Sequence, residues 1–263
     1  MTVIDGVLRR ERAVVAVGLA AIAALAWLYI WHGAGMGMPA LAMTRLSLFP
    51  HLQAELPGSM DNAWPIVIAM WWVMMIAMMT PSAAPLVLLY GHVLRRHDPQ
   101  GRNAWLPSLL LLAGYLTVWL AFSLAAAALQ KLLEPAGLIS PMMLWSRSAW
   151  LSAGVLAAAG LYQLSNIKYA CLAQCRSPVR FLTEHWRPGL SGSFLLGVRH
   201  GAFCVGCCWT LMALLFIGGV MNLIWIAALT FAVLAEKLLP AGHAVSKVSG
   251  YVLLVWSAAT LIV

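Results

Sequence analysis

The chain has 263 residues, of which 63% are hydrophobic and only 9% are charged, and its mean hydropathy is +0.88. Roughly 25% of the residues in an ordinary soluble domain are charged, so this composition excludes a soluble globular protein. The formal net charge is +8. Its basic residues are scattered over short segments between apolar runs, which indicates membrane topology rather than nucleic-acid binding. We therefore expect the lipid bilayer as a partner and no nucleic acid.

Several apolar runs exceed the about 18 residues typical of a spanning helix, and they predict an all-α, polytopic transmembrane helical bundle. Three arginines, at positions 9, 10 and 12, precede the first run. That run is longer than the roughly 7–15-residue core of a signal peptide, so we expect a retained helix with a cytoplasmic N-terminus. We predict one membrane-embedded domain, 1–263. Its predicted helices are 13–31, 64–90, 105–130, 149–169, 193–216, 222–239 and 248–263.

The distribution of lysine and arginine supports this topology. Eleven basic residues fall in the predicted cytoplasmic segments, whereas only Arg45, Lys131 and Arg147 fall in outer loops. Such a bias between short loops predicts seven crossings with the C-terminus outside. Six crossings would follow if the last and shortest run does not cross. We also predict that 32–63 is an outer loop and that 184–194 is an interfacial or re-entrant segment on the cytoplasmic surface.

Three cysteines lie within five residues, in the run Cys204-Val-Gly-Cys207-Cys208. Positions three and four apart share one helical face, so the three thiols can converge on a single ion. Thiolates select copper(I), zinc or iron–sulfur centres over hard cations. A free cysteine is also an ordinary small core residue. Three in so short a run favour a soft-metal site.

A second pair of thiols, Cys171 and Cys175, lies one helical turn apart at the cytoplasmic end of the predicted helix 149–169. Side chains four apart on a helix often meet by chance, so the pair alone is a weaker indication than a pair three apart. Beside the first cluster, it adds two candidate ligands for the same soft metal.

A stripe of methionines at helical spacing marks the predicted helix 64–90. Such a stripe is more often adaptable packing than a row of ligands, but thioethers also bind soft metals. Pro81 and Pro85 follow the stripe. They remove backbone donors and predict a bend that faces a cavity. The candidate ligands here are Met74, Met75, Met78 and Met79.

The predicted outer loop holds imidazole and thioether groups on a glycine-rich stretch. These ligands suit the capture of a soft metal in an oxidising compartment, where thiols are lost by oxidation. The other interpretation is a loop whose methionines are incidental. The candidate capture residues are His32, Met36, Met38, Met43 and His51.

Depth along the helices predicts where the candidate ligands meet. At about 1.5 Å per residue, Met78 and Met79 lie about 21 Å from the outer end of their helix. If the fifth helix begins near Gly197, its cysteines lie about 10–16 Å from the inner end. Glu236 falls within a turn of the cytoplasmic face. We therefore predict one site in the inner half of the bilayer.

Three charged or titratable residues flank this site. His200, near the start of the fifth helix, is a candidate ligand, since ionisable groups at membrane depth usually mark function. Glu236 and Lys237 are adjacent and cannot share a helical face. We expect one of them to point into the bundle and the other to the interface. Glu236 is the better candidate for a metal or proton site.

Several blocks of the sequence together resemble a known family. They are AMMTPSAAP at 77–85, YQLSNIKYACLAQCRSP at 162–178, GVRHGAFCVGCCWTLMALLFIGGVMNLIW at 197–225, and Glu236-Lys237. This combination resembles the domain of unknown function 2182 family, uncharacterised bacterial proteins described as predicted metal-binding integral membrane proteins. The resemblance implies an all-helical, multi-pass protein of the bacterial inner (cytoplasmic) membrane whose Met, Cys and Glu residues bind metal. It implies little about activity.

The leading hypothesis is a soft-metal binding protein that takes part in metal transport or in delivery to a membrane metalloenzyme or metallochaperone. The expected metal is copper(I), and the alternatives are zinc or no metal. We assign no catalytic residues and do not expect an enzyme. One alternative is a membrane thiol oxidoreductase that uses Cys204 with Cys207 and Cys171 with Cys175. Another is a structural or assembly subunit of a larger membrane complex. The residues leave open the direction of transport, the partner and the oligomeric state.

Overall fold

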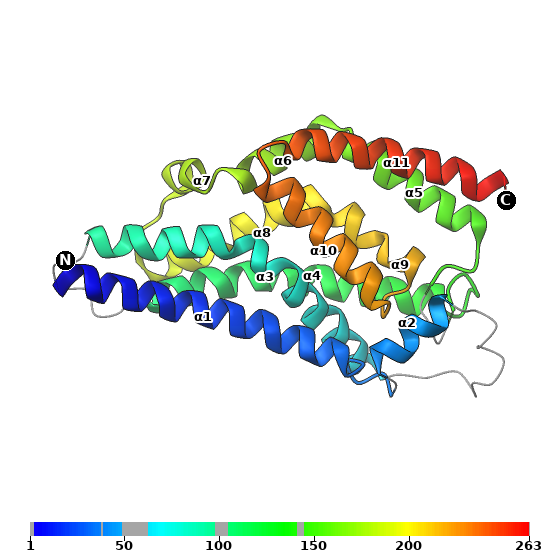
Figure 1. The fold of residues 1–263 in the computed structure, drawn as a ribbon, viewed down its shortest axis with the longest axis horizontal. Helices are drawn as coiled ribbons and strands as arrows, with labels where there is room; N and C mark the ends of the chain where they lie inside the picture. Colours follow the sequence, from blue (N-terminus) through cyan, green and yellow to red (C-terminus); the bar gives the residue numbers. More distant parts are fainter. Residues whose placement is uncertain (1–2, 38, 49–62, 98–104, 141–144, 263) are drawn as a thin grey trace.

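The computed structural model describes residues 3–37, 39–48, 63–97, 105–140 and 145–262 (Figure 1). These residues form helices and no strand, apart from one isolated β-bridge between Ile139 and Ser146. The all-α prediction is confirmed. The helices are α1 (Val3–Trp31), α2 (Ala40–Leu48), α3 (Trp64–His97), α4 (Trp105–Leu133), α5 (Ala149–Gln163), α6 (Asn166–Arg176), α7 (Pro178–His185), α8 (Gly189–Ala213), α9 (Leu215–Gly218), α10 (Leu223–Leu238) and α11 (Gly242–Ile262).

Five of the described helical segments are long and apolar enough to cross a membrane. The helices α5 and α10, with 15 and 16 residues, are shorter than the roughly 20 residues that a full crossing needs. Figure 1 shows the first turns of α1 and the end of α11 at opposite ends of the longest axis, as an odd number of crossings requires. Seven crossings stay a prediction. The five segments are Ala13–Trp31, Trp64–Arg95, Trp105–Leu133, Gly189–Gly218 and Gly242–Ile262.

Two of the predicted segments are divided differently in the structure. The predicted helix 149–169 is two helices, because the backbone is extended at Ser165, whose side chain accepts a hydrogen bond from the Lys168 amide to start α6. The predicted segment 184–194 is also divided between two helices, and its interfacial position stays a prediction. The short helix α7 ends at His185, and α8 begins only four residues later, at Gly189.

The prediction that 32–63 is entirely loop is wrong where α2 lies. The carbonyl of Pro39 accepts hydrogen bonds from the amides of Ala42 and Met43, which starts the helix. Ala40 and Met43, three residues apart, are both buried, so this short helix is held by one apolar face. Thr44 on α2 accepts a hydrogen bond from the Leu223 amide, which fixes α2 against the first turn of α10.

Close packing of α8 against α4 depends on two glycines. A side chain at Gly197 would collide with the Leu111 carbonyl oxygen, and one at Gly114 would collide with that of Phe194. Small residues at such crossings let two helix backbones approach closely within a membrane. This crossing lies along the same α8 that carries three of the five cysteines, so it sets which α4 side chains can reach them.

Helix α3 carries Pro81 and Pro85 inside its length and remains continuous from Trp64 to His97. Figure 1 shows that it bends near the middle of the molecule, as the two prolines predict. Helix α10 crosses beside this bend and contacts α3, α8, α6 and α11. The bend therefore lies where elements from both halves of the chain meet.

Candidate metal centre

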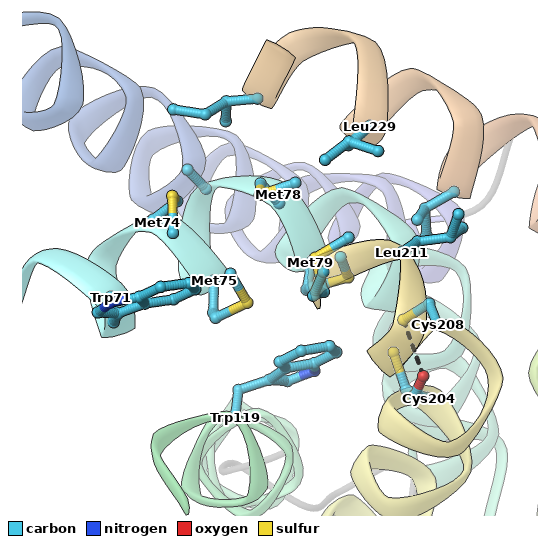
Figure 2. Packing of buried hydrophobic residues seen from close by; sticks show 14 of the residues in the cluster. Trp71, Met74, Met75, Met78, Met79, Trp119, Cys204, Cys208, Leu211 and Leu229 are labelled. Carbon is cyan, nitrogen blue, oxygen red and sulfur yellow. Dashed lines mark hydrogen bonds between the residues drawn. The ribbon is translucent and has the colours of Figure 1, made fainter. Parts of the chain in front are cut away.

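The three cysteines of α8 lie on one buried face, as their spacing predicts. Cys204, Cys207 and Cys208 are all within the core of the bundle. The thiols of Cys207 and Cys208 donate hydrogen bonds to the Cys204 carbonyl oxygen, at 3.1 and 2.9 Å. Figure 2 shows the bond from Cys208. The three sulfurs are thus held on one turn of helix, away from lipid.

A fourth sulfur joins this face from α6. The Cys175 sulfur lies 4.0 Å from that of Cys207. Cys171, one turn earlier on α6, packs instead against Gly206, where an added Cβ would lie 2.9 Å from the Cys171 sulfur. All five cysteines are free thiols. The structure therefore brings Cys175 to the α8 thiols and places Cys171 against the α8 backbone.

Helix α4 contributes a group that the sequence analysis missed. The Tyr115 hydroxyl lies 3.0 Å from the Cys204 sulfur and donates a hydrogen bond of 3.1 Å to the Met79 carbonyl oxygen. It thereby connects α8 to α3 at the bend. A lone tyrosine in an apolar helix has no spacing signal of its own, so only the packing of α4 on α8 could reveal it.

The methionines predicted as ligands are all buried on α3. Figure 2 shows Met79 on the side of the stripe nearer Cys204 and Cys208, with Met75 beyond it and Trp119 facing both. The row continues along α3 through Met74 to Trp71 (Figure 2). The methionine thioethers thus form a buried row along α3 that leads away from the thiols of α8.

Lys237 approaches the cysteines from the last turn of α10. Its ammonium donates hydrogen bonds to the Cys204 sulfur at 2.8 Å and to the Ser82 hydroxyl at 3.2 Å. The expectation that only one of Glu236 and Lys237 points inward is wrong, since both are buried. The reason is that α10 is packed on several sides, against α3 and α8 as well as α6 and α11.

Glu236 belongs to a separate polar cluster and does not bind a thiol. One carboxylate oxygen lies 2.6 Å from the Lys168 ammonium, and the other accepts a hydrogen bond of 2.8 Å from the Gln163 amide. Lys168 also donates to the side-chain amide oxygen of Gln163, and the Ser246 hydroxyl donates to the same oxygen. The predicted role of Glu236 as a ligand would require this cluster to open.

His200 lies one turn before Cys204 on the same helix. Its ring is buried against Tyr115 and Phe181, with ring centroids 5.7 and 5.0 Å apart. The Nδ1 atom has no hydrogen-bond partner in the described structure. The histidine is thus next to the thiol face but is held by aromatic neighbours.

The predicted capture residues divide into three groups. His32 is exposed at the end of α1, whereas Met36 and Met43 are buried in the core. Met38 and His51 lie outside the described residues. The capture role stays a prediction, and two of its thioethers are covered by the protein in this arrangement.

The depth of the thiol face differs from the predicted one. Because α8 begins at Gly189 rather than near Gly197, Cys204 lies about 22 Å along the helix, close to its middle. Within the described residues, no three side chains of the His, Cys, Asp and Glu types are arranged to hold a metal ion. The donor set itself, clustered thiols beside thioethers, is the type that soft ions prefer.

Comparison with known families decides the class of metal. A family described as PpoB2, copper chaperone, matches residues 68–260. The chain belongs to this copper chaperone family. The matched region runs from α3 to α11 and contains every cysteine, whereas α1 and α2, with His32, Met36 and Met43, lie before it. No curated protein and no solved structure matches the chain.

The family match refines the resemblance drawn from the sequence blocks. The matching family is metal-related, as the resemblance implies, but it is not the domain of unknown function 2182 family. It also gives the copper-related role a basis that does not depend on the cysteine spacing alone.

Proposed function

We propose that this protein is a membrane copper chaperone that binds copper(I) between two of the clustered thiols of Cys175, Cys204 and Cys207, with Cys208 beside them, and delivers it to a membrane metalloenzyme or a metallochaperone. The family match supports the metal, and thiolate chemistry supports its monovalent state. The observation that carries the proposal is the approach of Cys175 on α6 to Cys207 on α8.

The distance between these two sulfurs suits a shared ion. Two metal–sulfur bonds of about 2.3 Å each can span 4.0 Å at an open angle. Because a ligand sulfur has lost its proton, copper binding replaces the S–H···O bond of Cys207 to the Cys204 carbonyl. The hydrogen bond to the Cys204 carbonyl thus keeps the Cys207 sulfur on the face that also holds the other α8 thiols.

The methionine row supplies a path to this site in the proposal. Thioethers are neutral soft ligands, so they bind copper(I) without the charge that thiolates bring. Copper passing from Met74 towards Met79 would therefore move from neutral sulfur donors to the anionic thiol face. Met36 and Met43, on the side of the molecule where α2 meets α10, extend the same type of donor towards the predicted entry.

A second candidate, a membrane thiol oxidoreductase, is favoured by the same sulfur contact. In that case Cys175 and Cys207 would form a disulfide in the working cycle, rather than Cys204 and Cys207 as the sequence suggests. The two functions differ in what the purified protein retains, namely a copper ion or an oxidised sulfur pair.

The test is copper retention by the full chain in detergent. Protein purified under reducing, oxygen-free conditions is loaded with copper(I), desalted and analysed for metal, beside a Cys204→Ser/Cys207→Ser/Cys208→Ser variant. We expect about one copper per chain in the parent and none in the variant. Equal copper in both samples would overturn the proposal. A parent that keeps no copper but shows a Cys175–Cys207 disulfide by mass spectrometry would favour the oxidoreductase, and one with neither would favour an assembly subunit.

A further inference from the structure

Among the residues that the structure describes, the buried lysines outnumber the buried carboxylates. Lys168 and Glu236, 0% and 2% exposed, form an ion pair with 2.6 Å between nitrogen and oxygen. Lys237, 6% exposed, is a second buried ammonium. In the part of the chain that the structure describes, no carboxylate lies within 4.0 Å of it. One positive charge is therefore left over in the interior.

The neighbours of Lys237 show where its counter-charge must come from. Its ammonium bonds to the Cys204 sulfur at 2.8 Å and to the neutral Ser82 hydroxyl at 3.2 Å. An ammonium that is buried without an anion is costly, so such a group normally lies beside an opposite charge. Of these two contacts, only the Cys204 sulfur can carry the negative charge that Lys237 needs, either as a thiolate or as part of a metal–thiolate complex.

We propose that Lys237 is the counter-charge of the thiolate-bound copper and that it makes the site prefer a monovalent ion. The inference rests on the proposed function and adds a residue that does not touch the metal. When copper(I) binds two thiols, two protons leave to solvent and the complex carries one negative charge. Lys237 then makes the assembly neutral. A divalent ion on the same two thiolates is already neutral and leaves Lys237 uncompensated.

Neutrality matters here because the site is away from water. Cys204, Cys207 and Cys208 are within the core, and Lys237 is covered by helices on several sides. At an effective dielectric constant well below that of water, the interaction energy of two charges about 4 Å apart is several times larger than in solution. The charge on the metal, rather than ligand softness alone, would thus distinguish copper(I) from zinc, which also accepts thiolates.

The test compares metal preference in variants that differ only in charge. Full-length protein in detergent is titrated with copper(I) against a coloured copper(I) chelator, and separately with zinc. In Lys237→Met we expect copper(I) affinity to fall about tenfold or more, the loss of one charged hydrogen bond, while zinc affinity holds or rises. Lys237→Arg should retain the copper preference. Lys247→Met, which removes an exposed lysine of α11, should change neither affinity.

The ratio of copper(I) affinity to zinc affinity separates this inference from a purely structural role of Lys237, since a loosened site would bind both metals more weakly. Lys237→Gln keeps a donor towards Ser82 and serves as the second neutral variant if Lys237→Met does not fold. An unchanged copper-to-zinc ratio in the neutral variants would overturn the inference and leave the proposed function intact. A parent protein that binds no copper(I) would overturn the proposed function itself.

Discussion

Two adjacent residues of α10 enter two different buried clusters, one in which the charges are paired and one in which a charge is not. Glu236 meets Lys168 and Gln163, and its two carboxylate oxygens both have partners. Lys237 meets Cys204 and Ser82, neither of which carries a carboxylate. The first cluster is complete without any ligand, whereas the second has a spare positive charge beside titratable sulfur. In a membrane interior, the complete network is structural and the incomplete one is a candidate site for a ligand.

The largest expected effect comes from breaking the complete cluster. Lys168→Met leaves the Glu236 carboxylate buried and unpaired, which we expect to cost about 3–5 kcal/mol of folding free energy. The measurement is the temperature at which the protein in detergent loses its monodisperse peak in size-exclusion chromatography. The control is Lys168→Met/Glu236→Leu, which removes both charges and should recover most of the loss. A double variant as unstable as the single one would refute the view that the pair is self-contained.

The second expected effect separates the two cysteines of α6. Cys175→Ser should remove most of the retained copper, because the Cys175 sulfur lies 4.0 Å from that of Cys207. Cys171→Ser should leave copper retention unchanged, because this sulfur packs against the backbone at Gly206. Both variants change one sulfur to oxygen on the same helix, so they are closely matched. Equal retention in the two would show that the contact between α6 and α8 plays no part in binding.

A third change acts on the helix crossing that positions the thiol face. Gly197→Ala forces α8 away from the Leu111 carbonyl of α4, at a cost of about 1–3 kcal/mol. Because the same crossing brings Tyr115 to Cys204, copper(I) affinity should fall together with stability. Gly154→Ala on α5, where an added Cβ meets no atom within 4 Å, is the matched control. We expect it to leave the unfolding temperature within the error of measurement.

A smaller effect is expected when the Tyr115 hydroxyl alone is removed. Tyr115→Phe leaves the ring in place but deletes the contacts of the hydroxyl with Cys204 and the Met79 carbonyl. We expect a loss of about 1–2 kcal/mol in unfolding free energy. Copper stoichiometry should remain as in the parent, since the hydroxyl is not a proposed ligand. Complete loss of copper would instead place Tyr115 among the ligands.

The smallest effect is expected at an exposed ion pair, which tests whether burial matters more than pairing. The hydrogen bond from Arg180 holds the pKa of the Glu184 carboxyl below its usual value, with Gln174 adding to the shift. A lowered pKa in the folded state means stability that is present above the usual pKa and lost as pH falls through the lowered one. Both groups face solvent, so Arg180→Ala should not measurably change the unfolding temperature at neutral pH. A shift as large as that of Lys168→Met would refute the emphasis on burial.

Much of the centre could be predicted from residue spacing and topology. Residues three and four apart on a helix share a face, so spacing alone places Cys204, Cys207 and Cys208 together. Topology predicted that Cys171 and Cys175 lie at the inner end of their helix near the first cluster, and the Cys175 sulfur does lie 4.0 Å from that of Cys207 on α8. The apolar runs likewise predicted an all-helical membrane bundle, with its long crossings near the observed bounds.

Other features of the centre depended on where helices begin and on which helices pack together, and the spacing of residues in the sequence predicts neither. The depth of Cys204 differs from the predicted one because α8 begins eight residues earlier than Gly197, after the short helix α7. The inward orientation of Lys237 escaped prediction because it requires α10 to be covered on several sides at once. Tyr115 escaped because a single tyrosine in an apolar helix is indistinguishable from packing.

The sequence by itself determined that this chain has apolar runs long enough to cross a membrane and that thiols, thioethers and three ionisable groups enter them. Only the tertiary structure decided which of those groups are paired and which are left open. Lys168 and Glu236 are 68 residues apart in the chain and neutralise each other, whereas Lys237, next to Glu236, faces sulfur. Charge pairing in a bundle is a property of the neighbouring helices, and helical spacing fixes a side chain's direction without fixing what it meets.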